Sequence, residues 1–131
     1  MSKTIDFLKE TGVFFLSTVN NNSPATRPFG AITEYEGKLL IATNPNKAVY
    51  KQLLTNNNVQ ITALRAGTRD WIRIDGIANE TFDLSIKQFM YDDCLNLHKH
   101  YTGANDDNFR VFIIDLTSIF LAEKGSKTKL L

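Results

Sequence analysis

The stretch RPFGAITEYEGKLLIATNPNK, from Arg27 to Lys47, contains two strand-like apolar runs with a cation at each end. The Glu36-Gly37 pair between the runs is typical of a tight two-residue turn. It therefore predicts an antiparallel hairpin in which residues 25–35 pair with residues 38–43.

A proline interrupts the first of these strands. Pro28 lacks a backbone N–H, so it is expected at a sheet edge or at a break in the pairing. We expect the strand to be interrupted over residues 27–30, which leaves backbone groups free for another partner.

The hairpin also brings the two cations together. Arg27 is expected near the far end of the second strand, close to Thr43 and Lys47. A helix is predicted over residues 44–56, and the N–H groups of its first turn favour an anion. The cluster can form a phosphate site, although two ordinary surface charges explain the same pattern.

The rest of the chain divides into segments that alternate between strand and helix periodicity. Asn44 or Asn46 is a plausible cap for the helix at 44–56. Residues 123–131 are expected to form a loose or partner-docking tail. The further predicted elements are a helix over 3–11, a strand over 13–20, strands over 58–64 and 70–82, a helix over 84–101 and an apolar strand over 109–122.

This order predicts a mainly β, α+β fold, in which about six antiparallel strands form a small closed barrel with helices outside. The 131 residues fit one domain, 1–131. The net charge of +1 gives no support for binding nucleic acid. No apolar run is long enough to span a membrane, and the N-terminal segment lacks a signal core, so we expect a soluble, cytoplasmic protein.

Common catalytic and metal motifs are absent from the sequence. There is no glycine-rich phosphate loop, no nucleophile elbow and no Cys/His cluster with zinc-ligand spacing. Cys94 is expected to be a structural thiol on an apolar helix face. His98 and His100 lie two residues apart and would point in different directions on a helix, so a shared metal is not expected. Solvated positions near a helix end are the interpretation we favour for both, with haem ligation as the alternative.

The order of FLSTVNNNSPATRPFGAI, GKLLIATNPNKAVYKQLLTNNNVQI and WIRIDGIA resembles the FMN-binding split-barrel family, the pyridoxamine 5′-phosphate oxidase-like superfamily. The resemblance covers about residues 5–122 and implies a split β-barrel with flanking helices. It further implies a homodimer that binds two FMN molecules at the subunit interface, and a small-molecule substrate or electron donor.

The resemblance also implies roles for particular residues. Arg27 and Lys47 would hold the FMN phosphate, assisted by Thr43. Trp71 would reach the flavin from near or across the dimer interface, together with Arg73, although a plain core aromatic is the alternative for Trp71. The remaining implied cofactor-binding residues are Pro28, Phe29 and Gly30 along the isoalloxazine, and Ala42 beside the ring or the ribityl chain.

The chain departs from true pyridoxamine phosphate oxidases at two places. It has only Asn46-Lys47 where they carry Ser-Arg-Lys, and it ends in SKTKLL, without their Trp/Arg-containing closing segment. It resembles the short, nitroimidazole-reductase-like members more closely. An FMN-dependent oxidoreductase is therefore expected, with an electron carrier or redox sensor, or a haem- or deazaflavin-binding member of the same barrel, as alternatives. No catalytic acid or base is assigned.

Overall fold

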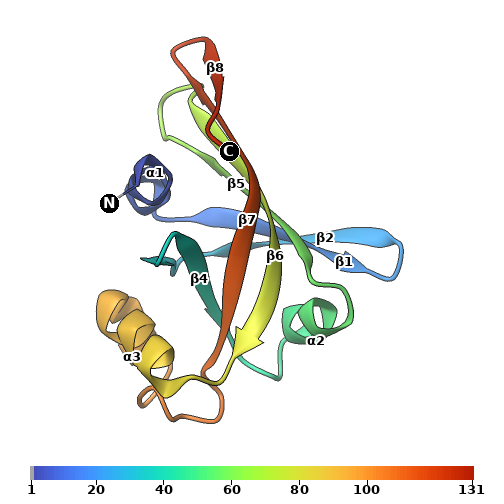
Figure 1. Ribbon diagram of the computed structural model, residues 1–131, viewed down its shortest axis with the longest axis vertical. Coiled ribbons are helices and arrows are strands. Elements are labelled where there is room, and N and C mark those ends of the chain that lie inside the picture. Colours follow the sequence, from blue (N-terminus) through green and yellow to red (C-terminus); the bar gives the residue numbers. More distant parts are fainter. Residues whose placement is uncertain (1) are drawn as a thin grey trace.

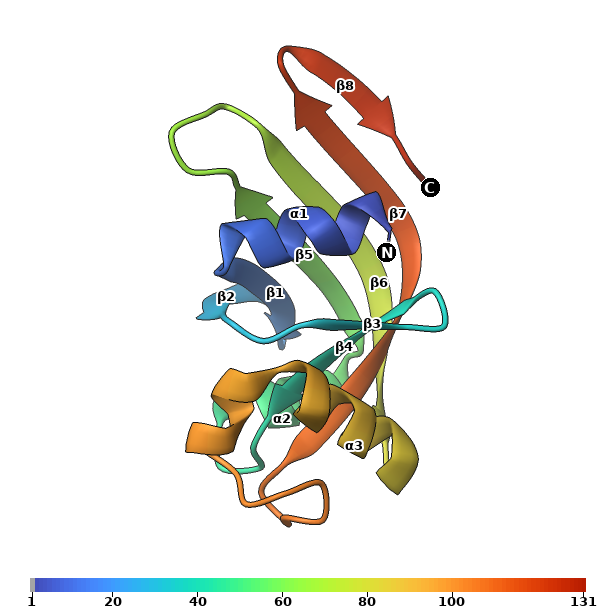
Figure 2. The same ribbon diagram turned by 90° about the vertical axis from the view of Figure 1, so that its left-hand side faces the viewer.

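One continuous antiparallel sheet dominates the fold. The computed structural model describes residues 2–131 and contains eight strands in this sheet, three α-helices and one 3₁₀ helix (Figures 1 and 2). The elements in chain order are α1 (Lys3–Thr11), β1 (Phe14–Asn20), β2 (Ser23–Phe29), β3 (Thr33–Tyr35), β4 (Lys38–Thr43), α2 (Ala48–Thr55), β5 (Asn58–Leu64), β6 (Trp71–Thr81), α3 (Leu84–Asp93), η1 (Leu95–Lys99), β7 (Arg110–Glu123) and β8 (Ser126–Lys129).

The strand order explains why the barrel is split. The strands follow the order β2-β1-β5-β6-β7-β4-β3, and β8 adds to β7. β2 and β3 are consecutive in the chain but occupy opposite ends of this order. The mainly antiparallel α+β prediction is confirmed, whereas closure of the sheet is wrong, because the chain leaves strand geometry after Phe29 and crosses the open side of the sheet before Thr33.

The hairpin predicted from Glu36-Gly37 is present. Leu40 pairs with Thr33 across it, and the two turn residues have φ values of 50° and 77°. Positive φ at both central positions is the geometry that matches the twist of the flanking strands. The predicted strand over 25–35 is divided into β2 and β3, but the break begins after Phe29, later than the predicted break over 27–30. Only Thr33–Tyr35 pairs with β4, because β2 pairs with β1 instead.

Two hydrophobic clusters pack on this sheet. The larger one fills the concave side of the sheet beneath α1 and α2, and includes Leu16, Ile61 and Ile74. The smaller one lies beneath α3 and η1 and is centred on the fully buried Phe109. The second cluster fixes η1 against the end of β4, and this contact forms one wall of the site described below.

The end of the next helix also differs from the sequence prediction. The helix predicted over 84–101 ends at Asp93, and the chain continues as η1. The thiol of Cys94 bonds to the backbone oxygen of Ile32 at 3.3 Å and lies 3.1 Å from the hydroxyl of Thr33. These contacts accompany a non-helical backbone at Cys94, with φ −112° and ψ 89°.

The predicted tail is a strand in this structure. β8 pairs with the end of β7, and Lys124 and Gly125 form the turn between them with positive φ values. Every residue of β8 is exposed, so its pairing depends on the turn and on backbone hydrogen bonds rather than on burial. None of the helices within residues 2–131 is long and apolar enough to cross a membrane.

Candidate functional site

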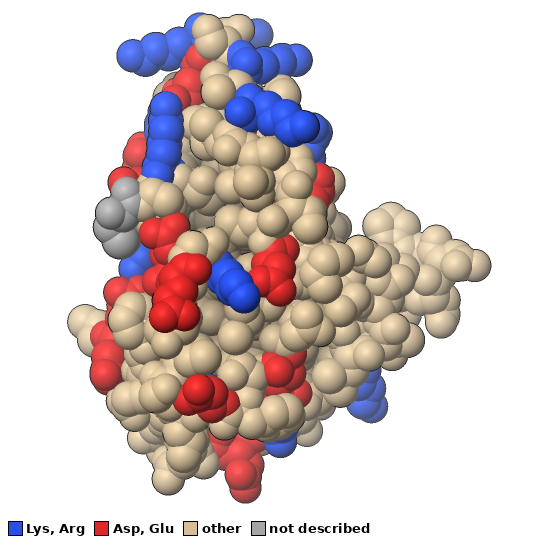
Figure 3. Space-filling model, in the orientation of Figure 1, with Lys and Arg blue, Asp and Glu red and all other residues tan. Residues whose placement is uncertain are grey.

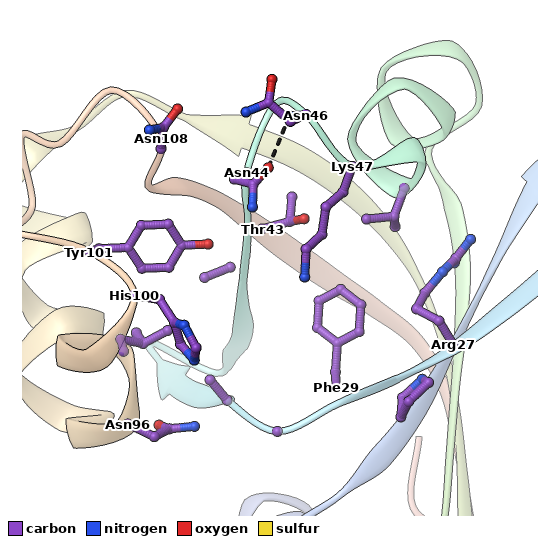
Figure 4. Close-up of a pocket in the computed structure, with 16 residues that line it drawn as sticks. Arg27, Phe29, Thr43, Asn44, Asn46, Lys47, Asn96, His100, Tyr101 and Asn108 are labelled. Atoms are coloured by element: carbon purple, nitrogen blue, oxygen red, sulfur yellow. Dashed lines mark hydrogen bonds between the residues drawn. The ribbon is translucent and has the colours of Figure 1, made fainter.

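A cavity of about 450 Å³ opens where the chain leaves β2 and where β4 ends (Figure 4). Its volume lies within the usual range of small-molecule pockets. Three parts of the chain form its walls: the β2 end with the interruption, the β4 end with the start of α2, and the segment around η1. The lining residues are Arg27, Pro28, Phe29, Gly30, Ala31, Ala42, Thr43, Asn44, Asn46, Lys47, Val49, Asn96, Leu97, His100, Tyr101 and Asn108.

The wall formed by β4 and α2 is suited to an anion. Lys47 is the N-cap residue of α2, and no side chain caps the helix. Lys47 extends its amine toward the cavity and forms no ion pair with any residue between Ser2 and Leu131. The first turn of a helix carries backbone N–H groups without intrahelical partners and the positive end of the helix dipole. A phosphate at this position would meet both.

Thr43 contributes an unpartnered hydroxyl to the same wall. Thr43 is only 4% exposed, yet its Oγ1 has no hydrogen-bond partner. Buried hydroxyls are rarely left unbonded, because the lost hydration costs about 1–3 kcal/mol. A ligand oxygen in the cavity would satisfy this hydroxyl. The residues of this wall therefore fit a phosphate-bearing ligand.

Arg27 lines the cavity, but its guanidinium points toward β1 and α2. It donates to the side-chain oxygen of Gln52 at 2.7 Å, to Thr18 Oγ1 at 2.8 Å and to the backbone oxygen of Leu16 at 3.2 Å. All three partners are uncharged, and burial lowers the pKa of Arg27. The sequence brought Arg27 and Lys47 to one cavity, as predicted, but in this structure only Lys47 points its cation into it (Figure 4).

The wall beside β2 is largely apolar. Phe29 packs on Phe14 with ring centroids 5.9 Å apart, and Pro28, Gly30 and Ala42 also line the cavity. The backbone at Gly30 and Ala31 lies outside any strand. An apolar wall interrupted by backbone groups outside the sheet is suited to a flat ring with a polar edge.

The third wall contains three functional candidates that sequence reasoning missed, together with His100, which it considered only as an alternative haem ligand. Asn96, His100, Tyr101 and Asn108 all line the cavity. Burial raises the pKa of the Tyr101 hydroxyl. The sequence placed these residues on one regular helix and the following loop. Nothing in that pattern indicates that η1 turns them toward β4.

Trp71 and Arg73 are not among the residues that line this cavity. They lie on the outward face of β6, where the guanidinium of Arg73 stacks over Trp71 and Phe120. Trp71 is half-buried and is not part of either core cluster. A role for these two residues at the flavin would require a second subunit and stays a prediction.

The cavity favours anionic or neutral ligands. No Asp or Glu is among its lining residues, whereas Lys47, Arg27 and His100 are. Within residues 2–131, no group of three or more His, Cys, Asp or Glu side chains could hold a metal ion. The arrangement thus offers an anion-binding end, an apolar slot and a wall of hydrogen-bonding side chains.

Comparison with known proteins finds a family and similar solved structures. Residues 2–122 match the family described as pyridoxamine 5′-phosphate oxidase. A NimC/NimA family protein from Clostridium acetobutylicum is 32% identical, with a TM-score of 0.89 over 97% of this chain and 88% of that one. No match was found among curated protein sequences.

More distant solved structures share the fold. A pyridoxamine 5′-phosphate oxidase-related, FMN-binding protein from Nostoc punctiforme has a TM-score of 0.72 at 14% identity, over 95% of this chain and 82% of that one. A haem-binding protein from Mycobacterium smegmatis has a TM-score of 0.75 at 14% identity, over 92% of this chain and 53% of that one. Because the family match spans nearly the whole chain, this protein belongs to the pyridoxamine 5′-phosphate oxidase family.

Proposed function

We propose that this protein binds FMN in the cavity and acts as an FMN-dependent oxidoreductase on a small molecule. The observation that carries the proposal is the buried, unpartnered hydroxyl of Thr43 beside the free ammonium of Lys47 and the uncapped start of α2. A phosphate ester would supply the acceptor oxygens and the negative charge that these groups lack. Family membership and an FMN-binding structural relative support FMN as the ligand.

Each wall of the cavity has a part in this proposal. Lys47, Thr43 and the first turn of α2 hold the phosphate. Phe29 and Ala42 exclude water from the faces of the ring, while the backbone near Gly30 meets its polar edge. When bound, FMN would supply the hydride or electron chemistry. The protein residues orient the cofactor and leave the wall around η1 open to a second molecule.

Retention of flavin after desalting tests the cofactor. The purified protein is mixed with FMN and desalted, and its absorbance spectrum is recorded beside those of Lys47→Ala, Arg27→Ala and Lys51→Ala. Lys51 is the matched control, because it is an exposed lysine one turn further along α2 and lies outside the cavity. We expect flavin bands in the wild type and in Lys51→Ala, and their loss in Lys47→Ala.

Turnover then separates an enzyme from an electron carrier or redox sensor. The flavin-loaded protein is mixed with NADH or NADPH and a panel of acceptors. Consumption of the nicotinamide that depends on an acceptor supports an oxidoreductase. A flavin that is reduced chemically, but that exchanges electrons with no substrate preference, supports the carrier.

Haem binding is the second candidate function. His100 lines the cavity and is exposed. A structural relative is a haem-binding protein. Addition of haem to the wild type and to His100→Ala tests this candidate. A Soret band of ligated haem that is lost in the variant, with no FMN retained by the wild type, would replace FMN with haem.

A further inference from the structure

The two histidines of the chain occupy different environments, although they are only two residues apart. His98 stacks on Tyr91 with ring centroids 4.1 Å apart, and its Nε2 lies 2.8 Å from the backbone oxygen of the same tyrosine. The ring of His100 instead meets that of Tyr101 edge-on, with centroids 6.4 Å apart, and Figure 4 shows its imidazole directed into the cavity. His98 is therefore part of the packing, whereas His100 is available to a ligand.

The backbone that carries His100 is firmly held. The N–H groups of His100 and Tyr101 both donate to the backbone oxygen of the buried Leu97, each at 3.0 Å. The hydroxyl of Tyr91 donates to the backbone oxygen of Tyr101 at 2.9 Å. A free imidazole on a fixed backbone is a group positioned for a ligand rather than one that belongs to a mobile loop.

The neighbours of His100 indicate what that ligand must be. Asn96 and Tyr101 place an amide and a hydroxyl on the same wall, and Leu97 adds an apolar surface. No carboxylate lines the cavity, so nothing there attracts a cation. The wall thus suits a flat, uncharged or anionic molecule with hydrogen-bond acceptors at its edge. His100 is solvent-exposed, so such a molecule can reach it from solvent.

We propose that His100 is a catalytic residue that binds a planar carbonyl acceptor, such as a quinone or an enone, and gives it a proton during reduction. This inference rests on the proposed function. A quinone that takes a hydride from the reduced cofactor becomes a hydroquinone mono-anion. Its charged oxygen takes the proton of the His100 imidazolium, which gives the neutral hydroquinone. The bound cofactor would supply this hydride and so become oxidised, and the imidazole regains its proton from water.

Two electron acceptors distinguish proton donation by His100 from a purely structural role of this residue. Flavin-loaded protein is reduced with one equivalent of dithionite under anaerobic conditions and mixed by stopped flow with 1,4-naphthoquinone or with ferricyanide. Ferricyanide takes electrons without a proton. General acid catalysis contributes about 10²–10⁴-fold, so His100→Ala should slow reoxidation by the quinone at least about tenfold. It should leave reoxidation by ferricyanide unchanged, and His98→Ala should leave both rates unchanged.

Binding gives a second readout that does not depend on turnover. Titration of 1,4-naphthoquinone into the oxidised, flavin-loaded protein should give a Kd that is about fivefold higher in His100→Ala, the effect of one lost hydrogen bond. The inference is overturned if His100→Ala retains FMN and keeps the wild-type quinone rate, or if the quinone and ferricyanide rates fall together. Failure of the wild type to retain FMN would instead overturn the proposed function, and this inference with it.

Discussion

At the residue scale, the hydroxyl of Thr43 lowers the stability of the protein and is positioned to bind a ligand. This buried hydroxyl has no hydrogen-bond partner. Thr43→Val replaces that hydroxyl with a methyl group of similar size. The ligand-free variant should be more stable than the wild type by about 1 kcal/mol, because an unpaired buried hydroxyl is removed. Urea unfolding without FMN measures this difference.

The same substitution should weaken FMN binding, and a fluorescence titration of the flavin measures that change. Opposite effects on stability and affinity distinguish a ligand-binding hydroxyl from a packing residue. A Thr43→Val variant that is less stable without ligand, and that binds FMN as the wild type does, would contradict this assignment.

Gly76 presents a different constraint, because β6 and β7 shift register beside it. A Cβ built on Gly76 would lie 2.5 Å from Ile114 Cγ2 and 2.8 Å from the backbone oxygen of Asp115. The backbone oxygen cannot move aside as a flexible side chain could. Gly76→Ala should therefore destabilise the protein by about 1–3 kcal/mol.

Gly103→Ala provides the matched control for this prediction. A Cβ on Gly103 would meet only the side-chain oxygen of Asn105, at the ordinary contact distance of 3.5 Å. Urea midpoints of the two variants test the comparison. Equal midpoints would show that β6 and β7 can move apart at Gly76 without loss of stability.

At the element scale, Arg65 ties α1 to the sheet. It forms ion pairs with Glu10 of α1 at 2.8 Å, with Asp70 at 2.6 Å and with Glu123 of β7 at 3.3 Å. Asp70 also accepts from the backbone N–H of Lys124 at 2.8 Å. The hydrogen bond from the Lys124 N–H does most to hold the pKa of Asp70 below its usual range, and the guanidinium of Arg65 lowers this pKa further.

This lowered pKa makes the stability of the protein sensitive to acid. The Asp70 contribution is present above the pKa of an unfolded aspartate, about 3.9. It is lost as the pH falls from there through the lower folded-state pKa. Urea midpoints between pH 7 and pH 3 should show that Asp70→Asn is less stable than the wild type at pH 7, and that the difference narrows toward pH 3.

Asp115→Asn is the control for the acid prediction. Asp115 forms an ion pair with Lys38 in which both side chains are half exposed, and such pairs contribute little. The urea midpoint of Asp115→Asn should follow that of the wild type from pH 7 to pH 3. A constant difference between wild type and Asp70→Asn at every pH would show that the Asp70 contacts are independent of its charge.

The elements also show how far the sequence could predict this fold. Periodicity and turn residues identified the three helices and the strands up to β7, because those features are local. The sequence could not show that the Cys94 thiol bonds to Ile32 and Thr33, contacts that span 62 and 61 residues. For that reason the end of α3, and with it the direction of His100, could not be predicted. β8 was missed because its residues are all exposed and lack an apolar alternation.

At the scale of the whole molecule, the outward face of the sheet carries a row of side chains with three apolar members, a threonine and an arginine. The row crosses neighbouring strands through directly paired residues: Pro28, Phe15, Thr62, Arg73 and Phe120. Phe15 is 47% exposed. Residues 13–26 contain no charged side chain, and the projecting β1–β2 hairpin is free of charge colours in Figure 3.

This surface is the structural support for the homodimer, which stays a proposal. A second copy that covers the row would bury Phe15, Phe120 and Trp71. Because Pro28 lies at the end of the row and lines the cavity, the partner would also approach the flavin site. An exposed apolar sheet face of this kind otherwise favours aggregation.

Light scattering coupled to size-exclusion chromatography tests the dimer. The wild type should elute with twice the mass of the 131-residue chain. Phe15→Arg replaces the exposed aromatic side chain of the row with a charge and should give monomers. Leu54→Arg is the control, because Leu54 is also an exposed apolar residue but lies on α2, away from the row. It should leave the mass unchanged.

The flavin content of the same fractions connects the interface with the site. If the partner subunit completes the FMN site, the Phe15→Arg monomers should lose flavin on desalting while the Leu54→Arg dimers retain it. Monomers that keep a full complement of FMN would show that one chain is sufficient for the cofactor. Trp71 and Arg73 would then have no route to the flavin, since the cavity of their own chain excludes them. A wild type that is monomeric at micromolar concentration would refute the dimer itself.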